Sequence, residues 1–171
     1  MKLQLKKCVE DKQFHHSCGM VGIRHLYQAL NKCGLQEYAY KIVTAQGYPS
    51  YSLWLENGAT TLWELWDCTE SKNHHMYSDV LSWMIKTIGG ISPDDNAATF
   101  EQIEVNPYYF KELSWAKASY DSPMGIVRCE WKREEGKIIL KIEAPNDRCV
   151  QYRGVYLKKG ENIFVMDENN M

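Results

Sequence analysis

The chain has 171 residues, of which 44% are hydrophobic and 25% are charged, enough apolar material for one ordinary domain or two small ones. The net charge is −2 and the pI is near 6.2. The chain therefore lacks the excess of basic residues that is typical of proteins that bind nucleic acids or membrane surfaces. The sequence holds no run of about eighteen apolar residues, and its first ten residues contain no apolar signal-peptide core, so neither a membrane span nor a signal peptide is predicted. The sequence does not predict the cellular compartment of the protein.

The six cysteines stand at positions 8, 18, 33, 68, 129 and 149. None of them forms a Cys-x-x-Cys pair, and their density is too low for a disulfide scaffold. We expect reduced thiols in the core or on the surface, with no metal and no cofactor.

The first half of the chain has helical periodicity. Apolar residues recur at spacings of three and four in residues 18–33, and Gly34 predicts the end of that helix. A second helix is predicted over about 35–46, so the two should form an antiparallel hairpin. A third is predicted over about 74–88, with Asn73 as its N-cap.

After about residue 90 the hydrophobic period falls to two. Residues 91–98 have the composition of a linker, and the Glu134-Glu-Gly136 sequence predicts a turn between two strands. Such short strands with frequent turns favour a β-sandwich. The predicted fold class is therefore α+β in segregated units, a helical domain over 1–90 and a sandwich over 91–171. The strands are expected near Phe100 to Val105, 115–120, 126–131, 138–142, 149–152, 155–157 and 163–165.

The segment from Gly47 to Asp67 combines aromatic rings with carboxylates. Flat aromatic faces cover the apolar side of a sugar ring, while carboxylates accept hydroxyl hydrogen bonds or take a proton from water. The composition of this segment favours carbohydrate chemistry. Its aromatic residues are Tyr48, Tyr51, Trp54, Trp63 and Trp66, and its acidic residues are Glu56, Glu64 and Asp67.

Glu64 is the first candidate for a catalytic carboxylate. A structural alternative is equally open, because Thr61-x-x-Glu64 fits a capping box, in which the glutamate bonds the N-cap amide. Its position between Trp63 and Trp66, after a glycine-bearing loop, favours chemistry, since functional residues concentrate on loops of rigid scaffolds. Glu56 is interpreted as an exposed loop residue.

Two other groups are interpreted as structural. Adjacent residues point to different sides of a helix, so the pair His74 and His75 is not expected to hold a metal; one of them bonding a hydroxyl is favoured. The His15–His16 pair is interpreted in the same way. The tryptophans at 83, 115 and 131 are expected in hydrophobic cores.

Several motifs resemble the C-terminal third of the bacterial α-L-rhamnosidases, glycoside hydrolase family 78. The resemblance covers about residues 13–165, and the Gly-Ala-Thr-Thr-x-Trp-Glu-x-Trp run is its most specific part. It rests on Cys18-Gly-Met-Val-Gly22, Tyr48-Pro-Ser50, Glu56-Asn-Gly-Ala-Thr-Thr-Leu-Trp-Glu-Leu-Trp-Asp67, Asn73-His-His-Met-Tyr77, Leu81-Ser-Trp83 and the segment from Trp115 to Trp131.

The resemblance implies the closing helices of an (α/α)₆ barrel followed by an antiparallel β-sandwich. It also implies inverting hydrolysis of terminal α-L-rhamnosides, in which a carboxylic acid and a water-activating carboxylate stand about 6.5–9.5 Å apart. The family's general base matches Glu64, and its sugar-contacting histidine matches His74. By the same resemblance, Tyr51, Trp54 and Trp63 are placed where side chains contact the substrate.

The family's general acid, which lies upstream in the barrel, has no counterpart in this sequence. The only acidic residues in positions 1–17 are Glu10 and Asp11, and neither lies in a matching motif. We therefore expect a rhamnosyl glycoside and the missing N-terminal part of the barrel as partners, and no activity from this chain alone. Two alternatives stay open, a non-catalytic carbohydrate-binding or interaction module and another (α/α)₆ glycosidase or lyase. The linkage preference is not predicted.

Overall fold

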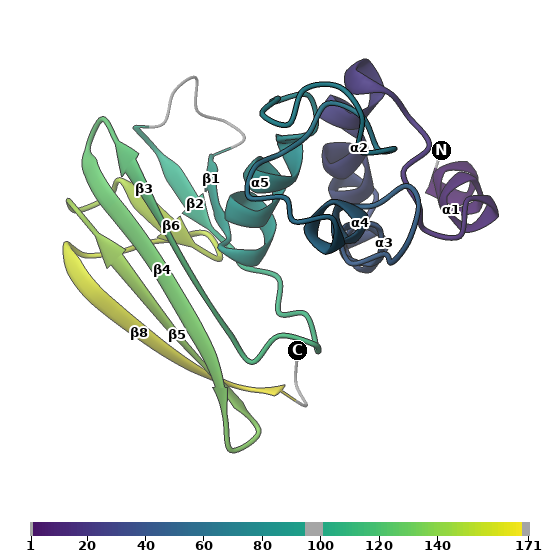
Figure 1. Ribbon diagram of the computed structural model, residues 1–171. Helices are drawn as coiled ribbons and strands as arrows, with labels where there is room; N and C mark the ends of the chain where they lie inside the picture. Colours follow the sequence, from purple (N-terminus) through teal and green to yellow (C-terminus); the bar gives the residue numbers. More distant parts are fainter. Residues whose placement is uncertain (1, 95–100, 169–171) are drawn as a thin grey trace. The chain divides into compact units, whose positions relative to one another are not determined.

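The computed structural model describes residues 2–94 and 101–168. The chain divides into two compact units, residues 1–83 and residues 84–171. The first is helical and the second is built mainly from strands, as the colours of Figure 1 show along the chain. This segregation confirms the predicted α+β class.

The helical unit contains α1 (Lys2–Asp11), α2 (Met20–Lys32), α3 (Gln36–Val43), α4 (Tyr51–Glu56) and α5 (Asp79–Trp83). Ile23, Tyr27 and Leu30 of α2 are buried at helical spacing, which confirms the predicted apolar face. α2 then ends in a Schellman motif, because Gly34 has φ 65° and the Leu35 N–H donates to the Leu30 carbonyl at 2.8 Å. The reversal brings α3 against α2, as predicted.

Helix α4 was not expected, since residues 47–67 were interpreted as loop. The Ser50 hydroxyl caps its first turn by accepting a hydrogen bond from the Leu53 N–H at 3.2 Å. The helix ends at Asn57, whose side-chain amide donates to the Leu53 carbonyl at 2.8 Å. This short capped helix fixes where the following loop begins.

The predicted helix over 74–88 forms only from residue 79 onward. Residues 74–78 are not helical, and Asn73 is not an N-cap. The His74 N–H donates instead to the Leu62 carbonyl at 2.8 Å, and the Met76 N–H donates to the His74 ring at 3.1 Å. These bonds replace the first turn of a helix. Residues 79–83 form α5, and Met84–Ile88 continue as the π-helix η1 in the second unit.

The described residues of the second unit form two four-stranded sheets. One has the order β1-β2-β6-β7, from β1 (Ile91–Pro93), β2 (Ile103–Val105), β6 (Val150–Tyr152) and β7 (Val155–Tyr156). The other has the order β3-β4-β5-β8, from β3 (Trp115–Ser122), β4 (Gly125–Glu134), β5 (Lys137–Ala144) and β8 (Gly160–Asp167). Neighbouring strands run antiparallel except β2 with β6, which pair in parallel. We call the sheet β3-β4-β5-β8 the long sheet and the sheet β1-β2-β6-β7 the short sheet. Figure 1 shows the long sheet in front of the short sheet.

The hydrophobic core of the second unit is formed by inward residues of both sheets, which confirms the sandwich. Trp131 of β4 is fully buried, as predicted, and its indole donates to the Ile88 carbonyl at 2.9 Å. The prediction for Trp115 was wrong, because its side chain is 61% exposed. On β3 the inward positions hold Ala116 and Ala118, and Trp115 lies on the opposite face.

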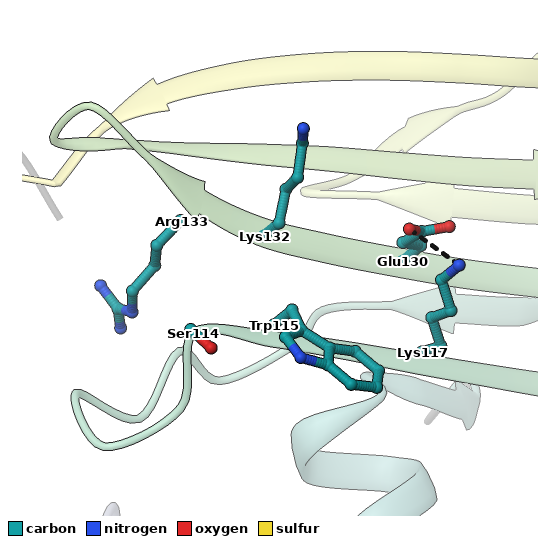
Figure 2. Close-up of a pocket in the computed structure, with 6 residues that line it drawn as sticks. All are labelled: Ser114, Trp115, Lys117, Glu130, Lys132 and Arg133. Carbon is teal, nitrogen blue, oxygen red and sulfur yellow. Dashed lines mark ion pairs between the residues drawn. The ribbon is translucent and has the colours of Figure 1, made fainter.

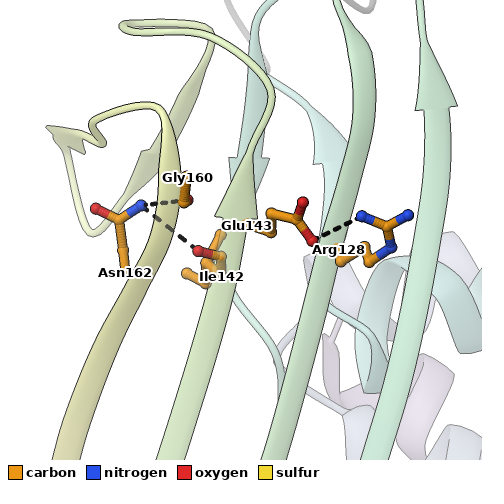
Figure 3. Close-up of polar contacts among 5 residues, drawn as sticks. All are labelled: Arg128, Ile142, Glu143, Gly160 and Asn162. Atoms are coloured by element: carbon orange, nitrogen blue, oxygen red, sulfur yellow. Dashed lines mark hydrogen bonds and ion pairs between the residues drawn. The ribbon is translucent and has the colours of Figure 1, made fainter.

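One turn of the sheet β3-β4-β5-β8 lies where the sequence predicts it. Glu135 and Gly136, with φ of 51° and 74°, connect β4 to β5 where a turn was predicted. Residues 91–93 of the predicted linker are instead strand β1, while 95–98 and Phe100 lie outside the described residues. Across the sheet, Arg128 pairs with Glu143 at 2.6 Å (Figure 3).

Beside this pair, the side-chain amide of Asn162 links the start of β8 to the neighbouring strand β5 by hydrogen bonds. It donates to the Gly160 carbonyl at 3.0 Å and to the Ile142 carbonyl at 3.5 Å (Figure 3). Among the residues that the structure describes, no helix is long and apolar enough to cross a membrane.

Candidate functional site

An aromatic cluster organises the helical unit around the 47–67 segment. Trp54 stacks on Trp66 with ring centroids 4.3 Å apart, and Tyr77 packs on the Trp66 ring at 4.3 Å. Tyr51 meets both tryptophans edge-on and donates its hydroxyl hydrogen to the Tyr77 carbonyl at 2.8 Å. Aromatic pairs in these geometries add to the stability gained from burial alone. The cluster therefore forms a rigid base under the neighbouring loop.

The loop between α4 and α5 folds back on itself over residues 57–78. The Glu64 N–H donates to the Ser71 carbonyl at 2.9 Å, and the Thr61 hydroxyl donates to the Lys72 carbonyl. The bond from His74 to the Leu62 carbonyl continues this pairing. The loop thus has two facing arms, with Glu64 on one and His74 on the other.

Glu64 lies on this loop and not in a helix, so the capping box that was the structural alternative does not form. One carboxylate oxygen, Oε2, accepts a hydrogen bond from the Ser71 N–H at 3.3 Å. Within the described part of the chain, no hydrogen bond to the other oxygen is found. The side chain is partly exposed, so this geometry leaves Oε1 free to accept a proton.

His74 is oriented by the same loop. Its Nδ1 accepts the Met76 N–H at 3.1 Å, so a neutral ring carries its proton on Nε2. The His75 ring stacks parallel to it, with centroids 5.2 Å apart. The expectation that the two histidines diverge from a helix was wrong, because no helix forms there. The backbone N–H of Met76 therefore orients the ring, which presents an N–H donor at Nε2.

The three aromatic candidates lie deeper than the carboxylate. Trp54 is 1% exposed, and its indole donates to the Leu65 carbonyl at 3.0 Å. Trp63 is 3% exposed, with the Lys72 ammonium 4.5 Å from its ring centroid. Tyr51 is partly buried in the cluster. These positions favour a supporting role under the loop, and direct contact of these rings with a substrate stays a prediction.

The other acidic residues of the segment have separate settings. Glu56 is exposed, as predicted, but it is the last residue of helix α4 and not a loop residue. Asp67 accepts hydrogen bonds from the Thr69 hydroxyl at 2.6 Å and the Thr69 N–H at 3.1 Å, and these bonds hold its pKa below the usual range. Asp67 therefore stabilises the loop tip as a charged turn residue.

Sequence reasoning missed the part that His16 plays in the aromatic cluster. Its ring stacks on Trp66, and its burial lowers its pKa to about 4. His15 instead lies outside the cluster, with ring nitrogens 3.0 Å and 2.9 Å from the Gln13 and Gln46 carbonyl oxygens. A pair of adjacent histidines could signal one buried member, but nothing in the pattern indicates which one.

No group of three His, Cys, Asp or Glu residues within 2–94 and 101–168 is arranged to hold a metal ion. All six cysteines are free thiols, as expected. A hollow of about 350 Å³ lies on α2 and next to the start of α5, separate from Glu64 and His74. It is lined by Met20, Val21, Arg24, His25, Gln28 and Asp79.

The helical unit with its carboxylate-bearing loop corresponds to part of a six-hairpin glycosidase domain, and the β-sandwich corresponds to the domain that follows it. Residues 1–88 match the model of the bacterial alpha-L-rhamnosidase 6 hairpin glycosidase domain, and residues 90–160 match that of the bacterial alpha-L-rhamnosidase C-terminal domain. The chain therefore belongs to the bacterial α-L-rhamnosidase family and represents its C-terminal region.

Individual relatives of this chain are also α-L-rhamnosidases. An α-L-rhamnosidase of Formosa agariphila is 34% identical over 144 residues, which cover 80% of this chain and 15% of that protein. The solved α-L-rhamnosidase from Dictyoglumus thermophilum matches 97% of this chain and 23% of its own, with 24% identity and a TM-score of 0.85. That of Streptomyces avermitilis, complexed with L-rhamnose, gives a TM-score of 0.81 at 24% identity, over 97% of this chain and 18% of its own. The chain thus spans less than a quarter of the length of these relatives.

Proposed function

We propose that this chain supplies the water-activating side of an α-L-rhamnosidase site. Glu64 acts as the general base, His74 contacts the sugar, and the general acid comes from a preceding part of the barrel. The observation that carries the proposal is the geometry of Glu64, one oxygen of which is fixed by the Ser71 N–H while the other accepts no hydrogen bond in the described part of the chain. A fixed carboxylate with one available oxygen suits proton abstraction from water.

His74 fits a positioning role beside the base. With Nδ1 occupied by the Met76 N–H, its neutral ring has Nε2–H as a donor. Such a donor suits a sugar hydroxyl, which accepts hydrogen bonds through two lone pairs. The loop pairing between Leu62 and His74 holds this donor on the arm facing Glu64.

The reaction also needs a partner for Glu64. An inverting glycosidase uses a second carboxyl group to protonate the leaving oxygen, about 6.5–9.5 Å from the base. Glu56 is exposed on α4, and Asp67 is held charged by Thr69, so neither is suited to donate that proton. We therefore expect the chain alone not to hydrolyse rhamnosides.

The alternative of a non-catalytic sugar-binding module at this loop receives less support. Such modules stack sugar rings on exposed aromatic faces, whereas Trp54 and Trp63 are almost fully buried. The alternative of another (α/α)₆ glycosidase is disfavoured by the family to which the chain belongs.

The proposal is tested by measuring release of the aryl group from an aryl α-L-rhamnoside. The chain alone should give no turnover. A chimera in which the chain replaces the corresponding C-terminal region of the Formosa agariphila relative should be active. Glu64→Gln in that chimera should lower kcat by about 10²–10⁴-fold, because the amide cannot accept a proton. Turnover by the chain alone, or full activity of the Glu64→Gln chimera, would overturn the proposal.

Glu56→Gln serves as the matched control, since it removes a neighbouring carboxylate that is exposed on α4. Its chimera should keep kcat within about threefold of the parent, well inside the effect expected for a lost base. His74→Gln separates positioning from chemistry: it should raise KM more than it lowers kcat if the histidine holds the sugar in both ground and transition states.

A further inference from the structure

The outer face of the long sheet carries an unexpected aromatic residue. Trp115 is the first residue of the edge strand β3 and is 61% exposed. A Trp side chain exposes a large apolar area, and leaving it in water costs free energy that inward placement would recover. The backbone of Trp115 belongs to the β3–β4 ladder, but no hydrogen bond or ring contact of its side chain is found within the described part of the chain. Its ring is therefore available to a ligand.

A shallow hollow of about 470 Å³ surrounds this tryptophan. Trp115 and Lys117 project from the same face of β3, and Lys117 reaches across to Glu130 of β4 (Figure 2). The hollow is lined by Ser114, Trp115, Lys117, Glu130, Lys132 and Arg133. It lies in the second unit, whereas Glu64 and His74 lie in the first.

The charges around the hollow are neutralised in pairs. Lys117 pairs with Glu130 at 3.1 Å, and Lys132 pairs with Glu134 at 2.7 Å. Arg133 pairs with Glu168. The hollow thus has no unpaired cation among these side chains that would select an acidic ligand. Instead, the hollow places a hydrogen-bond donor and an acceptor next to each other, beside the ring of Trp115.

The Lys117–Glu130 pair has the pattern that vicinal hydroxyl groups need. An ammonium donates only, and a carboxylate accepts only, so neighbouring hydroxyls of one sugar can accept from the first and donate to the second. Both side chains are about half-exposed, at 62% and 43%, so a ligand can reach them. Hydrogen bonds to charged groups are stronger than those between neutral groups.

We propose that this hollow is a second carbohydrate-binding site, which takes a neutral pyranose ring of a saccharide chain. The apolar face of the ring stacks on Trp115, and adjacent hydroxyls bond Lys117 and Glu130. Stacking on a single ring with a few hydrogen bonds gives affinity in the millimolar range. This role rests on the proposed function: the site holds a saccharide near the enzyme without taking part in the bond cleavage.

The surroundings of Trp115 are unlike the centre of a protein interface. Interface cores are depleted of lysine and glutamate, whereas this face carries charged ladders. The register places Lys132 directly opposite Trp115, and the ion pair between Arg128 and Glu143 lies farther along the same face. A small ligand that uses one ring and one ion pair fits this surface better than a second protein.

The test is a titration of the ¹⁵N-labelled chain, with the indole N–H resonances observed by NMR and that of Trp115 assigned from its loss in Trp115→Phe. The probes are xylohexaose, methyl α-L-rhamnopyranoside and, as an acidic comparison, trigalacturonate. The neutral probes should shift the Trp115 resonance at concentrations on the order of 10 mM. Lys117→Met should weaken binding by roughly fivefold or more.

Trp115→Ala should abolish the binding of xylohexaose observed by calorimetry, and the exposed position makes this variant tolerable for folding. Tyr156→Ala is the matched control, since Tyr156 is also an exposed aromatic residue but lies on β7 of the other sheet. It should leave binding unchanged.

Four results would overturn the proposal. The first is the absence of any Trp115 shift with both neutral probes, and the second is binding that persists in Trp115→Ala. The third is self-association in analytical ultracentrifugation that Trp115→Ala removes while the sugars have no effect. A preference for trigalacturonate would contradict the neutral ligand class.

Discussion

The imidazole of His16 lies stacked on the indole of Trp66, with ring centroids 4.5 Å apart and planes inclined by 18°. The Tyr51 ring meets the same imidazole edge-on at 5.0 Å, and the Tyr27 hydroxyl lies 3.4 Å from its Nε2. Nδ1 is buried and has no hydrogen-bond partner in the part of the chain that the structure describes. The site accepts a neutral ring and disfavours a charged one, because charge is costly to bury.

This burial predicts that the helical unit loses stability in mild acid. The pKa of His16 falls from its ordinary value of 6.5 to about 4, mainly through burial. Between these values the unfolded state binds a proton and the folded state does not, so the free energy of unfolding falls as pH falls. The loss should reach about 3 kcal/mol, measured by urea unfolding from neutral pH to pH 4.

The matched substitutions for this prediction are His16→Phe and His15→Gln. Phenylalanine keeps an aromatic ring against Trp66 but cannot take a proton, so it should flatten the pH dependence. His15→Gln should keep most of it, since His15 lies outside the aromatic cluster. An unchanged slope in His16→Phe would show that the acid sensitivity arises elsewhere.

Trp54→Ala tests whether the aromatic cluster supports the loop. Trp54 is 1% exposed and stacks on Trp66, so its removal leaves a large cavity. It also removes one hydrogen bond to the Leu65 carbonyl, which keeps the bond from the Cys68 N–H. We expect a loss of about 3–5 kcal/mol in the free energy of unfolding, measured by urea titration. Leu55→Ala, at the adjacent position but 69% exposed, should change it by no more than about 0.5 kcal/mol.

The sequence predicts the elements that rest on local patterns. The face of α2 follows from its spacing, and the stop at Gly34 follows from the need for a positive φ. The turn at Glu135–Gly136 is equally local. In each case the decisive interactions join residues only a few positions apart.

Long-range contacts explain the errors. The helix expected from residue 74 is displaced by the bond from His74 to the Leu62 carbonyl, twelve positions away, which no periodicity reveals. Alternation along β3 predicts two faces but not which one is buried, so Trp115 was assigned to the wrong face. For the site, the position of Glu64 between two tryptophans and the motif resemblance both singled it out, but its restraint by Ser71 depends on the folded loop.

The Ser71 bond gives a way to separate the chemistry of Glu64 from its structural role. Glu64→Ala removes the acceptor for the Ser71 N–H, whereas Glu64→Gln keeps an amide oxygen at the same reach. The alanine variant should speed hydrogen exchange at the Ser71 amide by roughly fivefold, the effect of one hydrogen bond. The glutamine variant should exchange like the parent chain. Equal acceleration in both variants would show that charge, and not the hydrogen bond, holds the loop.

Arg133 is predicted to be the most important charged residue for the stability of the second unit. Its Nε donates to the Leu113 carbonyl at 2.8 Å, and its Nη2 donates to the Tyr109 and Phe110 carbonyls at 3.0 Å and 2.9 Å. It also pairs with Glu168. Because Arg133→Met leaves three carbonyls without this donor, it should cost about 3 kcal/mol in the free energy of unfolding.

Arg128→Met is the control for this substitution, because it removes an arginine from the same strand β4. Arg128 makes an ion pair with Glu143 in which both side chains are about half-exposed, at 52% and 48%. Exposed pairs contribute little, so we expect a loss of no more than about 1 kcal/mol. Both variants are measured by urea unfolding followed in near-ultraviolet circular dichroism. Equal losses would mean that the backbone carbonyls near Arg133 find other donors, and that the guanidinium does not anchor the segment before β3.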